Sequence, residues 1–212
     1  MEGTEVPVAD VREVGADTIA LELETPDGFD ALPGQFVLLR AAPEDEVISR
    51  HYTLSSPSVE ETFELTVGVD PDGTLSPWLA DLEGGETVHV EGPFGTITYE
   101  GEEDVVAVAG GPGVGPAVAI AEAAHEAGHD AVVIYQDDDP AHEDRLEALT
   151  DAGADVVVID DGEDEAVAEA VATHLEDGRY YVFGFSDFVH AVADAIDDAG
   201  GDSDEALIEN FG

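Results

Sequence analysis

The spacing of hydrophobic positions changes near residue 100 and divides the chain into two predicted units. Before this point, short alternating or clustered apolar segments predict six strands, at 6–13, 18–24, 35–40, 50–54, 62–69 and 87–92. The sequences TPDG, LPG, PDG and EGG separate them and indicate turns, because Gly and Pro supply the backbone angles that tight turns need. This spacing predicts a small antiparallel six-stranded β-barrel over residues 1–100.

After residue 100, continuous apolar runs alternate with alanine-rich amphipathic segments. The runs predict strands at 105–109, 131–136, 155–160, 180–184 and 206–209, and the segments predict helices at 116–128, 140–152, 163–176 and 187–199. Asp139-Pro140 is typical of a helix start, and Ser186 is a candidate N-cap for the last helix. Strands that alternate with helices predict a parallel sheet in an α/β domain over residues 101–212.

The charge is strongly acidic, with Asp+Glu 52 against Lys+Arg 5, no lysine, and a net charge of -47. A hydrophobic fraction of 43% is that of a folded protein, so we expect the carboxylates on a solvated surface. This composition resembles adaptation to a cytoplasm of molar salt, where the Debye length shrinks to about 3 Å. Five arginines cannot form the basic surface that nucleic acid or anionic lipid requires, which excludes both as partners.

Cysteine is absent, which excludes disulfides, a cysteine nucleophile and a cysteine-ligated iron–sulfur cluster. The start MEGTEVPVAD lacks a secretion signal, and the uncharged run 105–121 is short and broken by Gly and Pro. We therefore expect a cytoplasmic protein. His125 and His129 are four residues apart, but no second ligand cluster accompanies them, so we expect no metal site.

A glycine-rich loop follows the strand at 105–109 and leads into a helix. Backbone N–H groups in such a loop can face a phosphate at the positive end of the helix dipole. The spacing departs from the Rossmann fingerprint, because Gly111 and Gly113 are followed by Pro116 at the third place. A phosphate site and a tight structural turn both remain open.

The stretch ISRHYTLSSP places one of the five arginines beside a tyrosine and several hydroxyl groups. Arg50, His51, Tyr52 and Thr53 resemble the flavin motif Arg-x-Tyr-Ser/Thr on a barrel strand. Three further segments resemble the ferredoxin–NADP reductase superfamily in the family's own order. DGTLSPWLADLEGGETVHVEGPFG (72–95) resembles its Gly-x-x-Ser turn, GGPGVGP (110–116) its nicotinamide loop, and ENFG (209–212) its C-terminal end. PGQFVLLR (33–40) is similar to the strand that precedes the flavin motif, and the resemblance spans essentially the full chain.

The resemblance implies FAD in the barrel, with FMN as an alternative. Arg50 would neutralise the flavin phosphates, and the amides of Gly73, Thr74, Leu75 and Ser76, before a short helix at Pro77, would add uncharged donors. Tyr52 would lie against the isoalloxazine or ribityl chain, and His51 belongs to the same cofactor-binding stretch. Without the resemblance, the simpler interpretation is that Arg50 forms a surface ion pair with a nearby carboxylate and that Tyr52 packs in the barrel.

The resemblance also implies NADH or NADPH at the carboxyl edge of the parallel sheet. The implied binding residues are Gly110, Gly111, Gly113, Val114, Gly115 and Pro116, together with Phe183 and Gly184, where Phe183 replaces the family's cysteine. Thr53, Glu209 and Phe211 are the implied catalytic residues, with Phe211 a candidate ring to stack on the flavin. The alternative for the last two is a C-terminal strand with one hydrophobic anchor.

The residues after the strand at 131–136 bear on the choice of dinucleotide. Asp137 and Asp138 follow it, and an acidic group there can accept a hydrogen bond from a ribose 2′-hydroxyl. Arg145, expected two turns into the next helix, is the only cation nearby. This favours NADH over NADPH, although Asp139-Pro140 also suits a plain helix start.

The predicted function is hydride transfer from nicotinamide C4 to flavin N5, followed by electron transfer to a separate acceptor. The acceptor would be a ferredoxin-like protein or a small molecule. An electron-transfer subunit of a larger complex and a non-catalytic flavin or nucleotide sensor are the alternatives.

Overall fold

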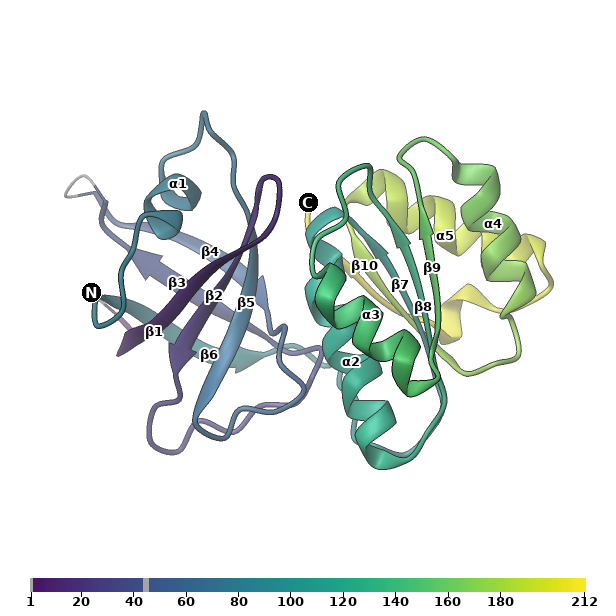
Figure 1. Ribbon diagram of the computed structural model, residues 1–212, viewed down its shortest axis with the longest axis horizontal. Helices are drawn as coiled ribbons and strands as arrows, with labels where there is room; N and C mark the ends of the chain where they lie inside the picture. The colour runs from purple at the N-terminus through teal and green to yellow at the C-terminus, as the bar shows by residue number, and fades with distance from the viewer. Residues whose placement is uncertain (1, 44–45) are drawn as a thin grey trace.

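The computed structural model describes residues 2–43 and 46–212 and places two domains side by side (Figure 1). The N-terminal domain contains β1 Thr4–Gly15, β2 Thr18–Glu24, β3 Phe36–Ala41, β4 Ile48–Thr53, β5 Thr62–Gly68 and β6 Thr87–Phe94, with one short helix, α1 Leu75–Ala80. All paired strands are antiparallel, in the order β4-β3-β6-β1-β2-β5. A bridge between Leu54 and Leu65 links the two ends of the sheet, which curls it into the predicted barrel.

The barrel core comes from the alternating pattern of its strands. In β3, for example, Val37, Leu39 and Ala41 are buried while the residues between them are less so. Alternation places successive side chains on opposite faces, so one face of each strand fills the interior. The other face of β4 is free to carry polar groups outside the core.

The C-terminal domain is a parallel five-stranded sheet with helices on both faces. Its strands are β7 Val105–Gly110, β8 Ala131–Gln136, β9 Asp155–Ile159, β10 Arg179–Gly184 and β11 Leu207–Asn210. Its helices are α2 Val114–Ala127, α3 Glu143–Ala152, α4 Asp164–Thr173 and α5 Ser186–Asp198, with single 3-10 turns at Gly111–Gly113 and Ser203–Glu205. The cores show that α2 and α3 cover one face while α4 and α5 cover the other. The predicted α/β architecture is confirmed.

The strand order β11-β10-β7-β8-β9 creates a switch point between β7 and β10. The chain leaves β7 toward α2 on one face and leaves β10 toward α5 on the other, so the two connections diverge. Ligands of open α/β sheets bind in the crevice at such a point. Gly110 and Gly184 are the last residues of these two strands and lie there. The segment 95–104 connects β6 to β7, and residue 100 lies within it.

Several predicted helix starts are wrong. Helix α3 begins at Glu143 and not at Asp139-Pro140. The Asp137 carboxylate accepts from the amide of Asp139 at 2.9 Å, and His142 has a left-handed φ of 58°, so the intervening chain forms a separate turn. Ser186 is the first residue inside α5 and its hydroxyl donates to the Gly212 carbonyl (3.1 Å), so it does not cap the helix.

Helix α1 begins at Leu75, before the predicted start at Pro77. Within the described ranges, no helix is both long enough and apolar enough to span a membrane.

Candidate active site at the domain interface

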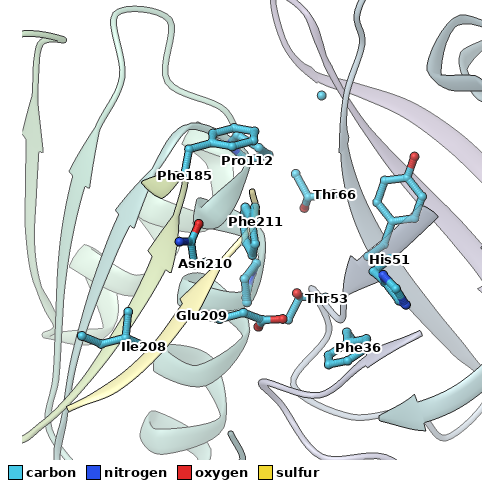
Figure 2. Close-up of a pocket in the computed structure, with 13 residues that line it drawn as sticks. Phe36, His51, Thr53, Thr66, Pro112, Phe185, Ile208, Glu209, Asn210 and Phe211 are labelled. Carbon is cyan, nitrogen blue, oxygen red and sulfur yellow. The ribbon is translucent and has the colours of Figure 1, made fainter. Parts of the chain in front are cut away.

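A cavity of about 550 Å³ lies where the barrel meets the parallel sheet. The barrel lines it with residues of β3, β4 and β5, and the α/β domain lines it with the start of α2 and the C-terminal strand (Figure 2). The lining residues are Phe36, His51, Tyr52, Thr53, Thr66, Gly68, Pro112, Pro116, Phe185, Ile208, Glu209, Asn210 and Phe211. Its volume is in the range of sites for small ligands and cofactors.

Strand β4 brings His51, Tyr52 and Thr53 of the arginine–tyrosine motif to this cavity, whereas Arg50 is not among its lining residues. Burial raises the pKa of Tyr52 to about 12, and the nearby Arg50 opposes the rise. The phenol therefore stays protonated and can donate a hydrogen bond. Arg50 is exposed, and its Nη1 donates to the carbonyl of Ser49 at 2.8 Å. Among residues 2–43 and 46–212, no carboxylate lies within 4.0 Å of the Arg50 guanidinium.

Strand β11 places Glu209 opposite Thr53, and their side chains point toward each other in Figure 2. Burial raises the pKa of Glu209 to about 7, and a hydrogen bond with the Thr53 hydroxyl opposes the rise. The Oε2 atom is buried and has no hydrogen-bond partner in the described part of the chain. The cavity therefore contains a carboxyl group that can gain or lose a proton near neutral pH.

The C-terminal segment is tied to the end of β10, which fixes Phe211 at the cavity. The amide of Phe211 donates to the Gly184 carbonyl at 2.9 Å. The Asn210 amide donates to the Ser186 hydroxyl at 2.9 Å, and the rings of Phe185 and Phe211 meet edge to face at 6.1 Å. Phe211 can therefore cover the space beside Glu209.

The structure separates the glycines of the 110–116 loop by role. Gly111 has a φ of 55° and open space where a side chain would stand, so its backbone can approach a ligand. A Cβ at Gly113 would collide with the Phe183 carbonyl, and one at Gly115 would collide with the Thr66 hydroxyl. These two glycines are therefore required for packing. A Cβ at Gly110 would also be too close to a neighbour, in this case the ring of Phe188.

Most of the other predicted binding residues lie outside the cavity lining; these are Arg50, Gly73 to Ser76, Gly110, Gly111, Gly113 to Gly115, Asp137, Phe183 and Gly184. The Phe183 side chain is fully buried, and its carbonyl group and Cβ lie against Gly113. Gly73 and Thr74 precede α1, Leu75 and Ser76 begin it, and the Gly73 amide already donates to the Asp70 carbonyl at 2.9 Å. The Asp137 carboxylate accepts from the Tyr135 hydroxyl at 3.0 Å. Their cofactor-binding roles remain predictions.

The cavity also contains residues that sequence reasoning did not single out. They are Phe36, Thr66, Gly68, Pro112, Phe185, Ile208 and Asn210. Phe36 lies in the segment 33–40 and Phe185 follows the Phe183-Gly184 pair, so their position beside recognised motifs was a usable signal. Thr66 carries no such signal, because β5 reads as an ordinary strand.

Comparisons with known proteins agree with this architecture. Residues 5–99 match the family model described as "Oxidoreductase FAD-binding domain". The glycine betaine monooxygenase reductase subunit of Chromohalobacter salexigens is 39% identical over 102 residues, which are 46% of this chain and 27% of that protein.

Among solved structures, the flavohem-like FAD/NAD-binding domain of nitric oxide dioxygenase from Vibrio cholerae has a TM-score of 0.81 at 22% identity, covering 100% of both chains. A ferredoxin NADP+ reductase from Neisseria gonorrhoeae with bound FAD and NADP has a TM-score of 0.78 at 18% identity, covering 99% of this chain and 98% of that one.

The fold that the chain shares with these structures has two domains, a barrel that matches the FAD-binding family model followed by an α/β domain with a parallel sheet. These findings agree with the resemblance inferred from the motifs: residues 5–99 match the oxidoreductase FAD-binding domain model, and the whole chain has the fold of the ferredoxin NADP+ reductase structure. The chain spans only about a quarter of the length of the Chromohalobacter reductase subunit, at 27%.

Proposed function

We propose that this chain is an FAD-dependent reductase that accepts hydride from NADH and passes the electrons to a separate acceptor. The observation that carries the proposal is the interdomain cavity, in which residues 51–53 of β4, Glu209 and Phe211 face one space together with Pro112 and Pro116 of the glycine loop. The acceptor is separate because the chain has no cysteine to ligate an iron–sulfur cluster of its own.

The residues present fit FAD. Arg50 is an exposed guanidinium that suits the pyrophosphate, and the amides of Thr74, Leu75 and Ser76 would add donors at the α1 turn. Tyr52 offers an aromatic face and a protonated hydroxyl. The unpartnered Oε2 of Glu209 is a buried polar atom that a polar ligand would satisfy. Bound FAD would supply the hydride-accepting ring and store the two electrons.

The chain's own groups would orient the reactants and handle the proton. Thr53 would hold the Glu209 carboxyl by its hydroxyl, and Glu209 would bind or release a proton near neutral pH. Phe211 would cover the site and give way to the nicotinamide. The contact between the domains would exclude water from this space.

We also propose a preference for NADH over NADPH. Asp138 is exposed beside the end of β8, and its carboxylate accepts from the Asp161 amide at 2.9 Å. Burial and the carboxylates of Asp137, Asp138 and Asp164 raise the pKa of Asp161, which indicates a concentrated negative charge at this edge of the sheet. A 2′-phosphate here would be repelled.

The arginine nearest to this edge cannot offset that charge. Arg145 lies in the first turn of α3, not two turns into it as predicted, and its guanidinium is hydrogen-bonded to Glu122 and Glu64. Comparison of kcat/KM for NADH and NADPH at molar KCl tests the preference. A higher kcat/KM for NADPH would contradict it.

The visible spectrum of the purified protein tests the main proposal. We expect oxidised flavin bands, FAD and not FMN after heat release and chromatography, and bleaching of these bands on anaerobic titration with NADH. Transfer to an artificial acceptor at steady state separates an enzyme from a flavin or nucleotide sensor. A flavin that NADH does not reduce would contradict the proposal.

A second candidate is the electron-transfer part of a larger complex. The observation that favours it is the similarity to a protein named as a reductase subunit. Reduction of a ferredoxin-like iron–sulfur protein much faster than of small acceptors would support this candidate.

The acidic, lysine-free composition leads us to propose that the protein works in a cytoplasm of molar salt.

A further inference from the structure

Arg145 joins the two domains through four hydrogen bonds. Two of them hold the guanidinium within its own domain, from Nε to Glu122 Oε1 at 2.8 Å and from Nη2 to Glu122 Oε2 at 2.6 Å. The other two cross to the barrel, from Nη1 to Glu64 Oε1 at 2.9 Å and from Nη2 to the Ser55 carbonyl at 2.7 Å. Because Glu122 fixes the planar group from α2, Arg145 is a rigid connection between the domains.

The ion cluster around Arg145 is largely buried at Arg145, Glu64 and Glu122, whereas Arg12 is half exposed and also lies 3.7 Å from Asp10. Arg12 donates from Nη2 to Glu64 Oε2 at 2.6 Å, so two arginines face two glutamates in a chain whose net charge is -47. The side chains of Arg145, Glu64 and Glu122 are 21%, 11% and 24% exposed. Burial raises the pKa of Glu64, and Arg145 and Arg12 oppose the rise. Two of the five arginines are therefore used at the domain interface.

The same interface reaches the candidate active site. His142, three residues before Arg145, donates its amide to the Val14 carbonyl at 2.8 Å, and its Nε2 lies 2.8 Å from the Thr66 hydroxyl. Thr66 lines the cavity and hydrogen-bonds the Ser55 hydroxyl at 2.7 Å. Gly115, in the glycine loop, packs directly on these two hydroxyls. The contacts beside Arg145 therefore place the start of α2 against the barrel.

We propose that Arg145 is a positioning residue for hydride transfer, because it sets the place of the 110–116 loop relative to the β4 strand. This inference rests on the proposed function. Hydride transfer needs the reacting atoms about 3–3.5 Å apart, and a misplacement of about 1 Å can cost roughly a hundredfold in rate. A change at Arg145 should therefore slow the chemical step more than it weakens NADH binding.

The test uses a variant that removes the three buried charges of the cluster together and leaves only the half-exposed Arg12. Arg145→Met combined with Glu64→Gln and Glu122→Gln neutralises all three groups together. Arg179→Met is the matched control. Arg179 forms an exposed ion pair with Glu103 at 3.1 Å, and it lies at the amino end of β10. Rapid anaerobic mixing with NADH would give the limiting rate of flavin reduction and the dissociation constant of NADH.

We expect the triple variant to keep its flavin and its reduction by dithionite. Its limiting rate of reduction by NADH should fall at least tenfold, with less than a threefold change in the NADH dissociation constant. The control should stay within twofold of wild type in both. In the flavin-free proteins, small-angle X-ray scattering should show a larger radius of gyration for the triple variant only.

An unchanged limiting rate in the flavin-loaded triple variant would overturn the inference, and so would an unchanged radius of gyration without flavin. If the triple variant does not fold, Arg145→Lys retains the charge but loses the planar fork, and a wild-type limiting rate there overturns the inference equally. If NADH fails to reduce the wild type, the proposed function fails. The scattering comparison then still decides whether Arg145 sets the domain arrangement.

Discussion

Replacement of Glu209 by Gln tests the central feature of the candidate site. The pKa of Glu209 rises from 4.5 to about 7, mainly because burial disfavours the charged form. A shift of this size corresponds to about 3.4 kcal/mol at about 1.36 kcal/mol per pKa unit. Because the side chain is only partly buried, solvent screening reduces this to about 2 kcal/mol.

The direction in which stability changes with pH follows from proton binding by Glu209. Between pH 4.5 and about 7 the folded protein holds a proton on Glu209 that the unfolded chain has begun to release. The free energy of unfolding therefore falls as pH rises through that window. Above it, the full cost of ionising the buried Glu209 carboxyl is present. Glu209→Gln is neutral at every pH, so it should stabilise the flavin-free protein by about 2 kcal/mol at pH 8 and by much less at pH 5.

Urea unfolding of the flavin-free proteins in molar KCl at pH 5 and pH 8 measures this difference. Glu205→Gln, on an exposed 3-10 turn, is the control and should change stability by less than about 0.5 kcal/mol at both pH values. In the flavin-loaded enzyme, the pH profile of reduction by NADH should show an inflection near pH 7 that Glu209→Gln abolishes. A pH-independent difference between wild type and Glu209→Gln would refute the reasoning.

Two further predictions concern charge. Arg50→Ala should lose FAD during purification while the chain stays folded in high salt, because a charge-assisted phosphate contact contributes roughly 1.5–3 kcal/mol; a wild-type ratio of flavin to protein absorbance would contradict this. The melting temperature should rise steeply from dilute buffer to molar KCl, because salt screens repulsion within a net charge of -47. A melting temperature that does not change with salt would show that surface repulsion is not a major cost.

The secondary structure of most of the chain followed from local sequence. The predicted strands 18–24 and 131–136 match β2 and β8 residue for residue. Alternation identifies a half-buried strand, and a continuous apolar run identifies a strand buried on both faces, so neighbouring residues were sufficient. The change from one pattern to the other also predicted the two kinds of sheet.

The motifs pointed to some of the residues that line the cavity, but the protonation of its groups depends on the fold. The order of residues in the β4 motif pointed to Thr53, and the C-terminal ENFG pointed to Glu209. The raised pKa of Glu209 arises only when β11 is enclosed against the barrel, because the burial that causes it comes from both domains. The order of residues along the chain cannot predict this burial.

The start of α3 and the role of Arg145 were decided by tertiary structure alone. Asp139-Pro140 is a sound local helix signal, but the bonds of Asp137 and the left-handed His142 delay the helix to Glu143. Arg145 bonds Glu64, which is 81 positions earlier in the chain, and this pairing exists only once the two domains meet. Residue order determined which elements form, whereas the docking of the domains determined which charges are buried together, because burial and ion pairing depend on distances in space.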